Sequence, residues 1–221
     1  MTDWNSISRH IADVSGSPFA PARPRSVGGG CINSAVTLSD GERAYFIKLN
    51  RAEFLGMFEA EAAGLGEIAA TRTLRAPVPL CTGAAGGQAY IVMEYIRLGA
   101  NRRENPAEAG SLLAALHRTT AEAFGWERDN TIGSTPQPNG RDADWVRFWR
   151  ERRLGFQLAL AADNGYGGAL QTAGERLLQE FPAFLDHTPR PSLLHGDLWG
   201  GNLGYDEEGN PVVYDPAVYY G

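Results

Sequence analysis

The sequence contains little cysteine and no long hydrophobic run. Its 221 residues include two cysteines, Cys31 and Cys81, which are too few for a disulfide framework or a cysteine-based zinc site. No apolar stretch approaches the length that spans a bilayer, and the N-terminus lacks the charged and apolar regions of a signal peptide. We therefore expect a soluble cytoplasmic protein without a membrane partner.

The sequence also lacks an excess of positive charge. Lys and Arg number 20 against 26 Asp and Glu, so the net charge is −6. Binding to nucleic acid or to an anionic membrane surface usually requires a basic surface, so neither partner is expected. Internal repeats and low-complexity segments are missing as well. The hydrophobic share of 43% is ample for the core of one large domain or two small lobes.

The most informative stretch is His195-Gly196-Asp197-Leu198-Trp199-Gly200-Gly201-Asn202. An apolar run at 211–214 follows it and leads to Asp215. Protein kinases use an Asp as the base for the acceptor hydroxyl, and an Asn and a later Asp as magnesium ligands. An Asp near an Asn is by itself usually a capped turn, whereas the whole combination is far more specific. It predicts a phosphoryl-transfer site.

Each polar residue of this stretch receives a role in that interpretation. Asp197 is the candidate base or orienting carboxylate for the acceptor hydroxyl, and Asn202 and Asp215 are the candidate magnesium ligands. His195 is expected to orient the loop rather than to transfer a proton. Phosphate oxygens repel an incoming nucleophile, so this chemistry needs both a positioned base and cations that offset the negative charge.

A glycine-rich segment and a lysine are the candidate nucleotide-binding elements. Gly28, Gly29, Gly30 and Cys31 precede a strand expected at 35–38, and glycines let backbone N–H groups approach phosphates closely. Three glycines alone are more often only a flexible loop. A second strand expected at 44–49 contains Lys48, whose buried charge would need an anionic partner. The alternative is a Lys48 that faces solvent.

Glu61 is the candidate partner of Lys48. It lies at helical spacing beside the apolar positions Phe58 and Leu65. Glu59 is the competing residue, but it lies about 200° away around a helix of 3.6 residues per turn and should face solvent. The spacing therefore predicts the Lys48–Glu61 ion pair that holds the α- and β-phosphate lysine in kinases.

A strand at 89–93 leads into an expected hinge between two lobes. Glu94 and Tyr95 belong to this hinge, and by their position their backbone groups are candidates for hydrogen bonds to adenine. Met93 would lie behind the adenine, although a role as an ordinary core residue is equally good.

After the hinge the pattern turns helical. Asn105 is expected to cap a helix that ends at 124–126, a polar loop follows at 130–140, and Asp144 is expected to cap an amphipathic helix. The arginines of that helix are expected on a solvated face: Arg147, Arg150, Arg152 and Arg153. A last helix is expected at 168–185.

The predicted fold class is α+β, with two lobes. Residues 1–94 are expected to form an ATP-binding N-lobe, with an antiparallel sheet and one helix. Residues 95–221 are expected to form a mostly helical C-lobe that contains the hinge, the catalytic loop and the metal-binding Asp.

These motifs resemble the fructosamine kinase family over nearly the whole chain. Trp199 inside the loop, and Asp215-Pro216-Ala217 in place of Asp-Phe-Gly, distinguish the chain from protein kinases and from most aminoglycoside phosphotransferases and choline kinases. The resemblance implies a bilobal protein-kinase-like fold that uses ATP and Mg²⁺. It also implies phosphorylation of the 3-hydroxyl of fructosamines or ribulosamines, free or protein-bound. The product adduct is unstable, which associates the family with deglycation.

The resemblance also marks Trp199 as a candidate substrate contact and the C-terminus as incomplete. Family chains continue past Tyr219-Tyr220-Gly221 through several helices, so we expect this chain to be truncated. Two alternatives stay open at this point. One is a kinase for an aminoglycoside or an amino alcohol such as choline, and the other is a nucleotide-binding fragment without turnover.

Cys31 supports a separate hypothesis because of its place in the glycine-rich segment. Backbone N–H groups arranged for phosphate would also favour a thiolate, which is the reactive form of cysteine. We therefore expect Cys31 to be oxidisable and to pair with Cys31 of a second subunit in a homodimer. A buried, inert cysteine is the alternative.

Overall fold

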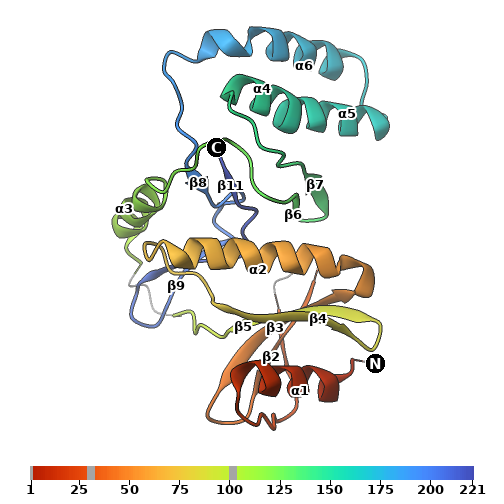
Figure 1. Cartoon of the computed structure of the whole chain (residues 1–221), viewed down its shortest axis with the longest axis vertical. Helices are drawn as coiled ribbons and strands as arrows, with labels where there is room; N and C mark the ends of the chain where they lie inside the picture. Colours follow the sequence, from red (N-terminus) through yellow and green to blue (C-terminus); the bar gives the residue numbers. More distant parts are fainter. Residues whose placement is uncertain (1, 29–32, 100–103) are drawn as a thin grey trace. The chain divides into compact units, whose positions relative to one another are not determined.

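The computed structural model describes residues 2–28, 33–99 and 104–221, which form two compact units (Figure 1). The first unit contains the residues up to 116 together with 197–216, and the second contains 117–196 together with 217–221. These units differ from the lobes expected at 1–94 and 95–221. The residues that follow Gly196 return to the first unit, whose internal packing includes them. The two-lobe boundary at residue 94 stays a prediction.

The first unit is built on a five-stranded antiparallel sheet with the strand order β1-β2-β3-β5-β4. The strands are β1 (Arg25–Val27), β2 (Ser34–Ser39), β3 (Ala44–Arg51), β4 (Pro79–Ala85) and β5 (Gln88–Glu94). The helices are α1 (Trp4–Ser15), α2 (Leu55–Ala70), which follows a 3₁₀ turn (Ala52–Phe54), and α3 (Pro106–Leu116). A separate hairpin consists of β9 (Leu203–Tyr205) and β10 (Pro211–Val213). The expected antiparallel sheet with a helix is thus present.

Helices α1 and α2 cover opposite faces of this sheet (Figure 1). Ile47 and Leu49 of β3 pack with Ile7 and Ile11 of α1 in one buried cluster. Successive side chains of a strand point to opposite faces, so Lys48 points to the face that α2 covers. The alternation of side chains along β3 therefore accounts for the direction of Lys48 toward α2, without any contribution from charge.

The β9–β10 hairpin is fixed to the sheet through a buried carboxylate at its turn. The side chain of Asp206 is only 2% exposed and accepts hydrogen bonds from the backbone N–H groups of Glu208 (3.1 Å) and Asn210 (2.8 Å). The Arg75 guanidinium donates to Asp206 at 2.8 Å and to Glu94 at 2.9 Å. Arg75 thereby connects the hairpin turn to the end of β5.

The second unit is mainly helical. Its helices are α4 (Trp145–Trp149), a π-helical segment (Arg150–Gly155), α5 (Phe156–Asp163), and α6 (Ala169–Glu180) with a 3₁₀ turn (Phe181–Phe184). Two short antiparallel strand pairs accompany them: β6 (Asn130–Ile132) with β7 (Thr135–Gln137), and β8 (Leu193–Leu194) with β11 (Tyr219–Tyr220). The Asp144 carboxylate accepts the Arg147 N–H at 2.7 Å, so the expected cap of α4 is present.

The helix that begins after Asn105 is shorter than expected. It ends at Leu116, and not at 124–126, so this prediction was wrong. Gly125 adopts a φ of +94° and exchanges two backbone hydrogen bonds with Tyr220. A residue that is committed to such a pairing cannot continue a helix.

The expected polar loop at 130–140 contains the β6–β7 hairpin and a set of buried amides. The Gln137 amide donates to Asn130 Oδ1 at 2.8 Å and to the Ala217 carbonyl at 3.0 Å. The Asn130 amide donates to the Val218 carbonyl at 2.8 Å. Buried amides need such partners, so these side chains position the backbone at 217–218.

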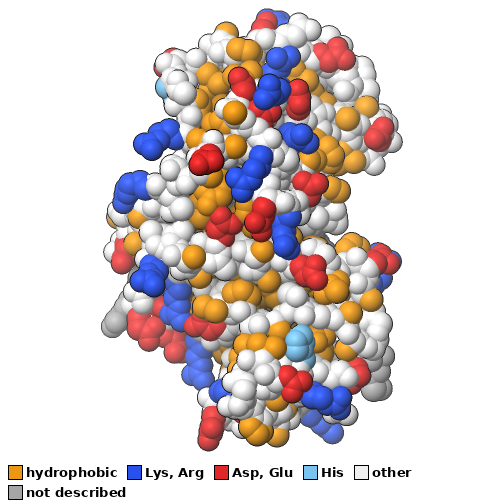
Figure 2. Space-filling view, viewed as in Figure 1, with side chains coloured by type: hydrophobic (Ala, Val, Ile, Leu, Met, Phe, Trp, Pro, Cys, Tyr) orange, Lys and Arg blue, Asp and Glu red, His pale blue; other side chains and the backbone are white. Residues whose placement is uncertain are grey.

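Charged side chains of both signs are interspersed over the face of the molecule shown in Figure 2. This mixture agrees with the modest net charge of −6. Among the residues that the structure describes, every helix is too short or too polar to cross a membrane.

The Asp206 contacts predict a pH-dependent contribution to stability. Burial alone would raise the pKa of Asp206, but hydrogen bonds from Asn210 and Arg75 hold this pKa below its ordinary value of 3.8. Because the folded-state pKa is lowered, the stabilisation is complete above the ordinary pKa and is lost as the pH falls through the folded-state pKa. We expect Asp206→Asn to lower the free energy of unfolding by about 1–3 kcal/mol at neutral pH.

Urea titrations of wild type and Asp206→Asn between pH 7 and 3 measure this difference, which should shrink as the pH falls below about 4. Glu207→Gln is the matched control, because Glu207 is the exposed neighbour of Asp206. Equal stability of the wild type and Asp206→Asn at pH 7 would contradict the assignment.

Candidate active site

Lys48 is the centre of the candidate site. Its side chain is buried in β3, and its Nζ lies 2.5 Å from Glu61 Oε1 of α2 and 2.5 Å from Asp215 Oδ1. Lys48 and Glu61 therefore form an ion pair, and a second carboxylate completes the group. Lys48 is also the only lysine in the sequence, where Lys and Arg together number 20. A single lysine in the chain is itself a sequence signal for Lys48, independent of the motifs around it.

The charges of this group set its protonation. Burial lowers the pKa of the Lys48 ammonium, but the negative charges of Glu61 and Asp215 outweigh burial and hold the pKa above its usual value. Lys48 is therefore a cation at neutral pH. Burial raises the pKa of Glu61, Lys48 opposes this shift, and the charge of Asp215 adds to it. The net result is a pKa of Glu61 above its ordinary value, with burial as the main cause.

Asp215 has an unusual backbone conformation. Its φ is +59°, and among the described non-glycine residues only Arg72 also has a positive φ. Such a conformation costs about 1–3 kcal/mol and persists where the surrounding structure enforces it, often at functional sites. The Asp215 side chain is 48% exposed, so its carboxylate contacts Lys48 on one side and solvent on another. The sequence motif predicts the residue, but no sequence pattern predicts its positive φ.

The loop before β9 brings Asp197 and Asn202 together. The buried Asn202 amide donates to the Asp197 backbone carbonyl at 2.8 Å and to Asp197 Oδ2 at 3.1 Å. The Asn202 N–H donates to the Trp199 carbonyl at 2.9 Å, and its own carbonyl accepts the Tyr214 N–H at 3.2 Å. The loop is thus closed on itself and bonded to the residue that precedes Asp215.

Asn202 and Asp215 offer oxygen atoms, which are the ligands that Mg²⁺ prefers. Magnesium sites commonly combine one or two side-chain ligands with water and substrate phosphates, so these two donors fit that ion. Within 2–28, 33–99 and 104–221, no three His, Cys, Asp or Glu side chains gather into a metal-binding group. A magnesium site here would therefore use the Asn202 amide oxygen as well as a carboxylate.

The glycine-rich segment is described only at its first residue. Gly28 follows β1 and is exposed. Gly29, Gly30 and Cys31 lie outside the described residues, so the phosphate contacts and the redox pairing through Cys31 stay predictions. Cys81 is described, and burial raises the pKa of its thiol to about 11, which disfavours the reactive thiolate.

The expected hinge residues have different environments. Met93 is 2% exposed and lies opposite Phe46 of β3, on the same face of the sheet as Lys48. The Glu94 N–H donates to the Val78 carbonyl at 2.8 Å, and the Glu94 carboxylate binds Arg75. Tyr95 is 37% exposed. The fold therefore already uses the N–H and the carboxylate of Glu94, and contacts to adenine stay a prediction.

His195 belongs to the second unit, where it is 2% exposed. Its carbonyl accepts the Ala217 N–H at 2.9 Å. A Cβ on the adjacent Gly196 would lie 1.8 Å from the Ala217 carbonyl oxygen, so only glycine fits there. The close approach of these two backbone segments is consistent with an orienting role for His195, which stays a prediction.

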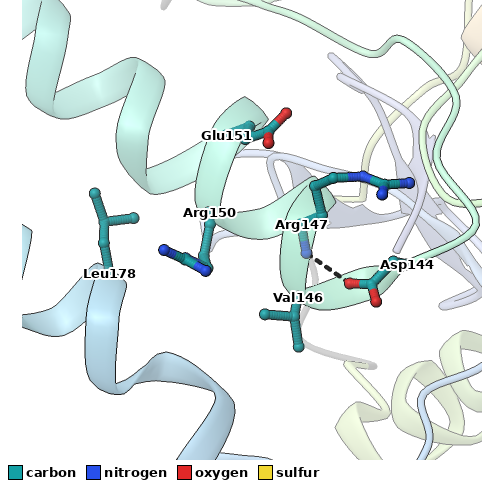
Figure 3. Close-up of a pocket in the computed structure, with 6 residues that line it drawn as sticks. All are labelled: Asp144, Val146, Arg147, Arg150, Glu151 and Leu178. Carbon is teal, nitrogen blue, oxygen red and sulfur yellow. Dashed lines mark hydrogen bonds between the residues drawn. The ribbon is translucent and has the colours of Figure 1, made fainter.

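The second unit also contains an open cavity of about 590 Å³ between α4, the π-helical segment and α6 (Figure 3). Arg150 and Leu178 point toward each other across it, while the Arg147 guanidinium points away from them (Figure 3). Arg147 binds Asp142 at 2.6 Å, and Glu151 lies beside Arg147. None of the predicted site residues lines this cavity, and its charges are of both signs.

The expectation of a solvated arginine face is wrong for Arg153. Its guanidinium lies 3.9 Å from the ring centre of Tyr219 and donates to the Pro138 carbonyl (2.6 Å) and to Asn139 Oδ1 (2.7 Å). Arginine stacks on aromatic rings while its planar fork donates hydrogen bonds, which explains this position inside the unit.

Comparisons with known proteins identify the family of the chain. A sequence model of the family described as fructosamine kinase matches residues 3–221. A Synechocystis protein named probable ketoamine kinase is 45% identical over 222 residues, which covers 99% of this chain and 74% of the relative. The chloroplastic protein-ribulosamine 3-kinase of Arabidopsis thaliana is 47% identical over 200 residues, with coverage of 89% and 61%.

Solved structures agree as well. A crystal structure from Haemophilus somnus, named as a fructosamine-3-kinase, has a TM-score of 0.89 and 26% identity and covers 99% of this chain and 73% of its own. An aminoglycoside phosphotransferase solved with AMP-PNP and hygromycin B has a TM-score of 0.62 at 18% identity, covering 98% and 73%. The second likeness shows the fold alone, which is the expected kinase-like α+β fold. By the match over residues 3–221 and the 45% identity, this chain belongs to the fructosamine kinase family.

Proposed function

We propose that this chain is a kinase that transfers the γ-phosphoryl group of ATP to the 3-hydroxyl of a ketosamine. The observation that carries the proposal is the ammonium of Lys48 held between Glu61 and Asp215 in a chain of this family. The names of the Synechocystis and Arabidopsis relatives support fructosamine-type or ribulosamine-type acceptors, free or protein-bound. Deglycation would follow because the phosphorylated adduct is unstable.

The residues divide the chemistry between nucleotide and acceptor. Lys48 binds the α- and β-phosphates, and Glu61 keeps the ammonium in place. Asp197 accepts the proton of the attacking hydroxyl, and its carboxylate is oriented by the Asn202 amide at 3.1 Å. Backbone N–H groups at 28–31 would cover the phosphates, and the hinge at 93–95 would receive adenine. Holding the two substrates in line supplies several kcal/mol of barrier lowering.

Asn202 and Asp215 would hold Mg²⁺, which supplies positive charge against the phosphate oxygens. The Lys48 ammonium is attracted to the same phosphates, so nucleotide would compete with Asp215 for it. That competition would leave the Asp215 carboxylate available as a ligand.

Trp199 would contact the acceptor. Its indole is 64% exposed and lies in the loop between Asp197 and Asn202. An exposed indole beside the proposed base offers a flat apolar surface to a substrate. We propose a cytoplasmic location for the chain, although its Arabidopsis relative is chloroplastic.

Asp197→Asn tests the proposed base. The base acts on the acceptor and not on the nucleotide, so we expect kcat to fall by about 10²–10⁴ while the Kd for ATP stays unchanged. Steady-state kinetics with a ketosamine, together with calorimetric titration of ATP, separate the two effects. A variant that keeps most of the wild-type kcat would exclude Asp197 as the base.

Lys48 offers a direct chemical test because it is the only lysine of the sequence. An acyl-phosphate derivative of ATP that acylates amines should modify Lys48, and excess ATP should protect it. Lys48→Ala should lose this labelling and should lower kcat/KM for ATP. Labelling confined to the N-terminal amine, or labelling at Lys48 that ATP does not prevent, would remove Lys48 from the nucleotide site.

The acceptor position is tested with a 3-deoxy ketosamine. The analogue lacks the accepting oxygen, so we expect no phosphorylation of it under conditions where the parent ketosamine is consumed. A panel with an aminoglycoside and choline in the same coupled assay tests the alternative acceptors. Phosphate found by NMR on the 3-deoxy compound would refute the 3-hydroxyl assignment.

A further inference from the structure

Two adjacent glycines follow Trp199, and the indole of Trp199 fills the side-chain space of the second one. A Cβ built on Gly201 would lie 2.2 Å from Cζ2, 2.4 Å from Cη2 and 2.7 Å from Cε2 of the Trp199 indole. Apart from its chain neighbours Trp199 and Gly201, a Cβ built on Gly200 would meet no atom of the described residues within 4 Å. The six-membered edge of the indole thus lies directly on the Cα of Gly201, in space that any side chain would occupy.

Backbone conformation does not explain the glycine at 201. Neither Gly200 nor Gly201 is among the described residues with positive φ, whereas the nearby Gly196 and Gly209 have φ values of +83° and +92°. The sign of φ therefore does not require glycine at position 201. The indole of Trp199 occupies the place of a Cβ at position 201, and this contact requires glycine there.

The rest of the loop fixes where the indole begins. The Trp199 carbonyl accepts the Asn202 N–H at 2.9 Å, and Asn202 is in turn bonded to Asp197. The backbone of Trp199 is therefore held between the proposed base and a proposed metal ligand. The direction of the Trp199 side chain is limited by its contact with Gly201, which borders one side of the indole. The rest of the side chain is open, since Trp199 is 64% exposed.

We propose that Gly201 is a positioning residue that seats the Trp199 indole so that its open surface receives the cationic amine of the acceptor. This inference rests on the proposed function and deepens it. A ketosamine differs from a free ketose by the amine at C1, which is protonated at neutral pH. Among side chains, Trp attracts a cation over its ring most strongly. The Trp199 indole, held in place by Gly201, thereby favours sugars that carry an amine over neutral sugars.

An alanine at 201 would displace the indole rather than the backbone. The atoms that its Cβ would meet belong to the outer end of an exposed side chain, which can rotate away at little cost. We expect the full chain to stay folded and to bind ATP normally. The effect should be confined to the acceptor.

The test compares wild type, Gly201→Ala and the matched control Gly200→Ala on two acceptors. One is an N-alkyl fructosamine, and the other is the corresponding 1-O-alkyl fructose, in which an ether oxygen replaces the amine. Gly201→Ala should lower kcat/KM for the fructosamine roughly tenfold. Its kcat/KM for the ether and its KM for ATP should each change by less than about twofold. Gly200→Ala should behave like the wild type.

A double-mutant cycle separates action through Trp199 from a general effect on the loop. In a Trp199→Leu background, Gly201→Ala should have no further effect on the fructosamine. Equal behaviour of the two glycine variants would overturn the inference. So would a loss that affects both acceptors or ATP to the same extent.

If the wild type phosphorylates neither acceptor, the proposed function fails, and calorimetric titration of the two acceptors decides the inference separately. If Gly201→Ala bound the fructosamine more weakly than the wild type but bound the ether equally well, the positioning role of Gly201 would be supported. Equal binding by wild type and variant, or no binding by either, would overturn it.

Discussion

The buried ammonium of Lys48 is the interaction on which the candidate site depends. An unpaired charge in an apolar strand would cost several kcal/mol, so the position is tenable only with carboxylates around it. Glu61 comes from α2 and Asp215 from the segment after β10, and both lie 2.5 Å from the same nitrogen. One atom thus holds a strand, a helix and a distant loop in a common arrangement. Asp215 has a positive φ within this arrangement, so the contacts around it offset the cost of a strained backbone.

The β9–β10 hairpin extends this constraint to both proposed metal ligands. Asn202 immediately precedes β9, and Asp215 follows β10 after one residue, so the hairpin determines their separation. Its turn is held by Asp206, and Arg75 connects that carboxylate to Glu94 at the end of β5. A hairpin fixed at its turn and at its open end cannot shift without disturbing the sheet. The ligands are therefore pre-positioned by hydrogen bonds within one unit.

The sequence predicted the local parts of this site and the fold class, but not the contacts between distant segments. Helical spacing placed Glu61 beside the apolar face of α2, because the helical period is a local property. The direction of Lys48 stayed open from the sequence, between an inward position and one that faces solvent. The Lys48–Asp215 contact joins residues 167 positions apart and follows from no local pattern. The strands β1 and β4 were missed because neither has a clear alternation and their neighbours in the sheet define them. Likewise, Arg153 has the sequence context of a surface residue, and its contacts with Tyr219, Pro138 and Asn139 explain why it is partly buried.

Glycines in the catalytic loop illustrate the same limit at the level of single residues. By sequence, Gly196, Gly200 and Gly201 all suggest flexibility. In the structure Gly196 combines a positive φ with a backbone oxygen where its Cβ would be, whereas Gly201 has an ordinary φ and an indole in that place. Gly200 has no positive φ, and apart from its chain neighbours no described atom lies within 4 Å of where its Cβ would be. The loop that ends at Asn202 is therefore closed by its hydrogen bonds. Gly196 allows a close approach of another backbone segment, and Gly201 allows a close approach of the Trp199 indole.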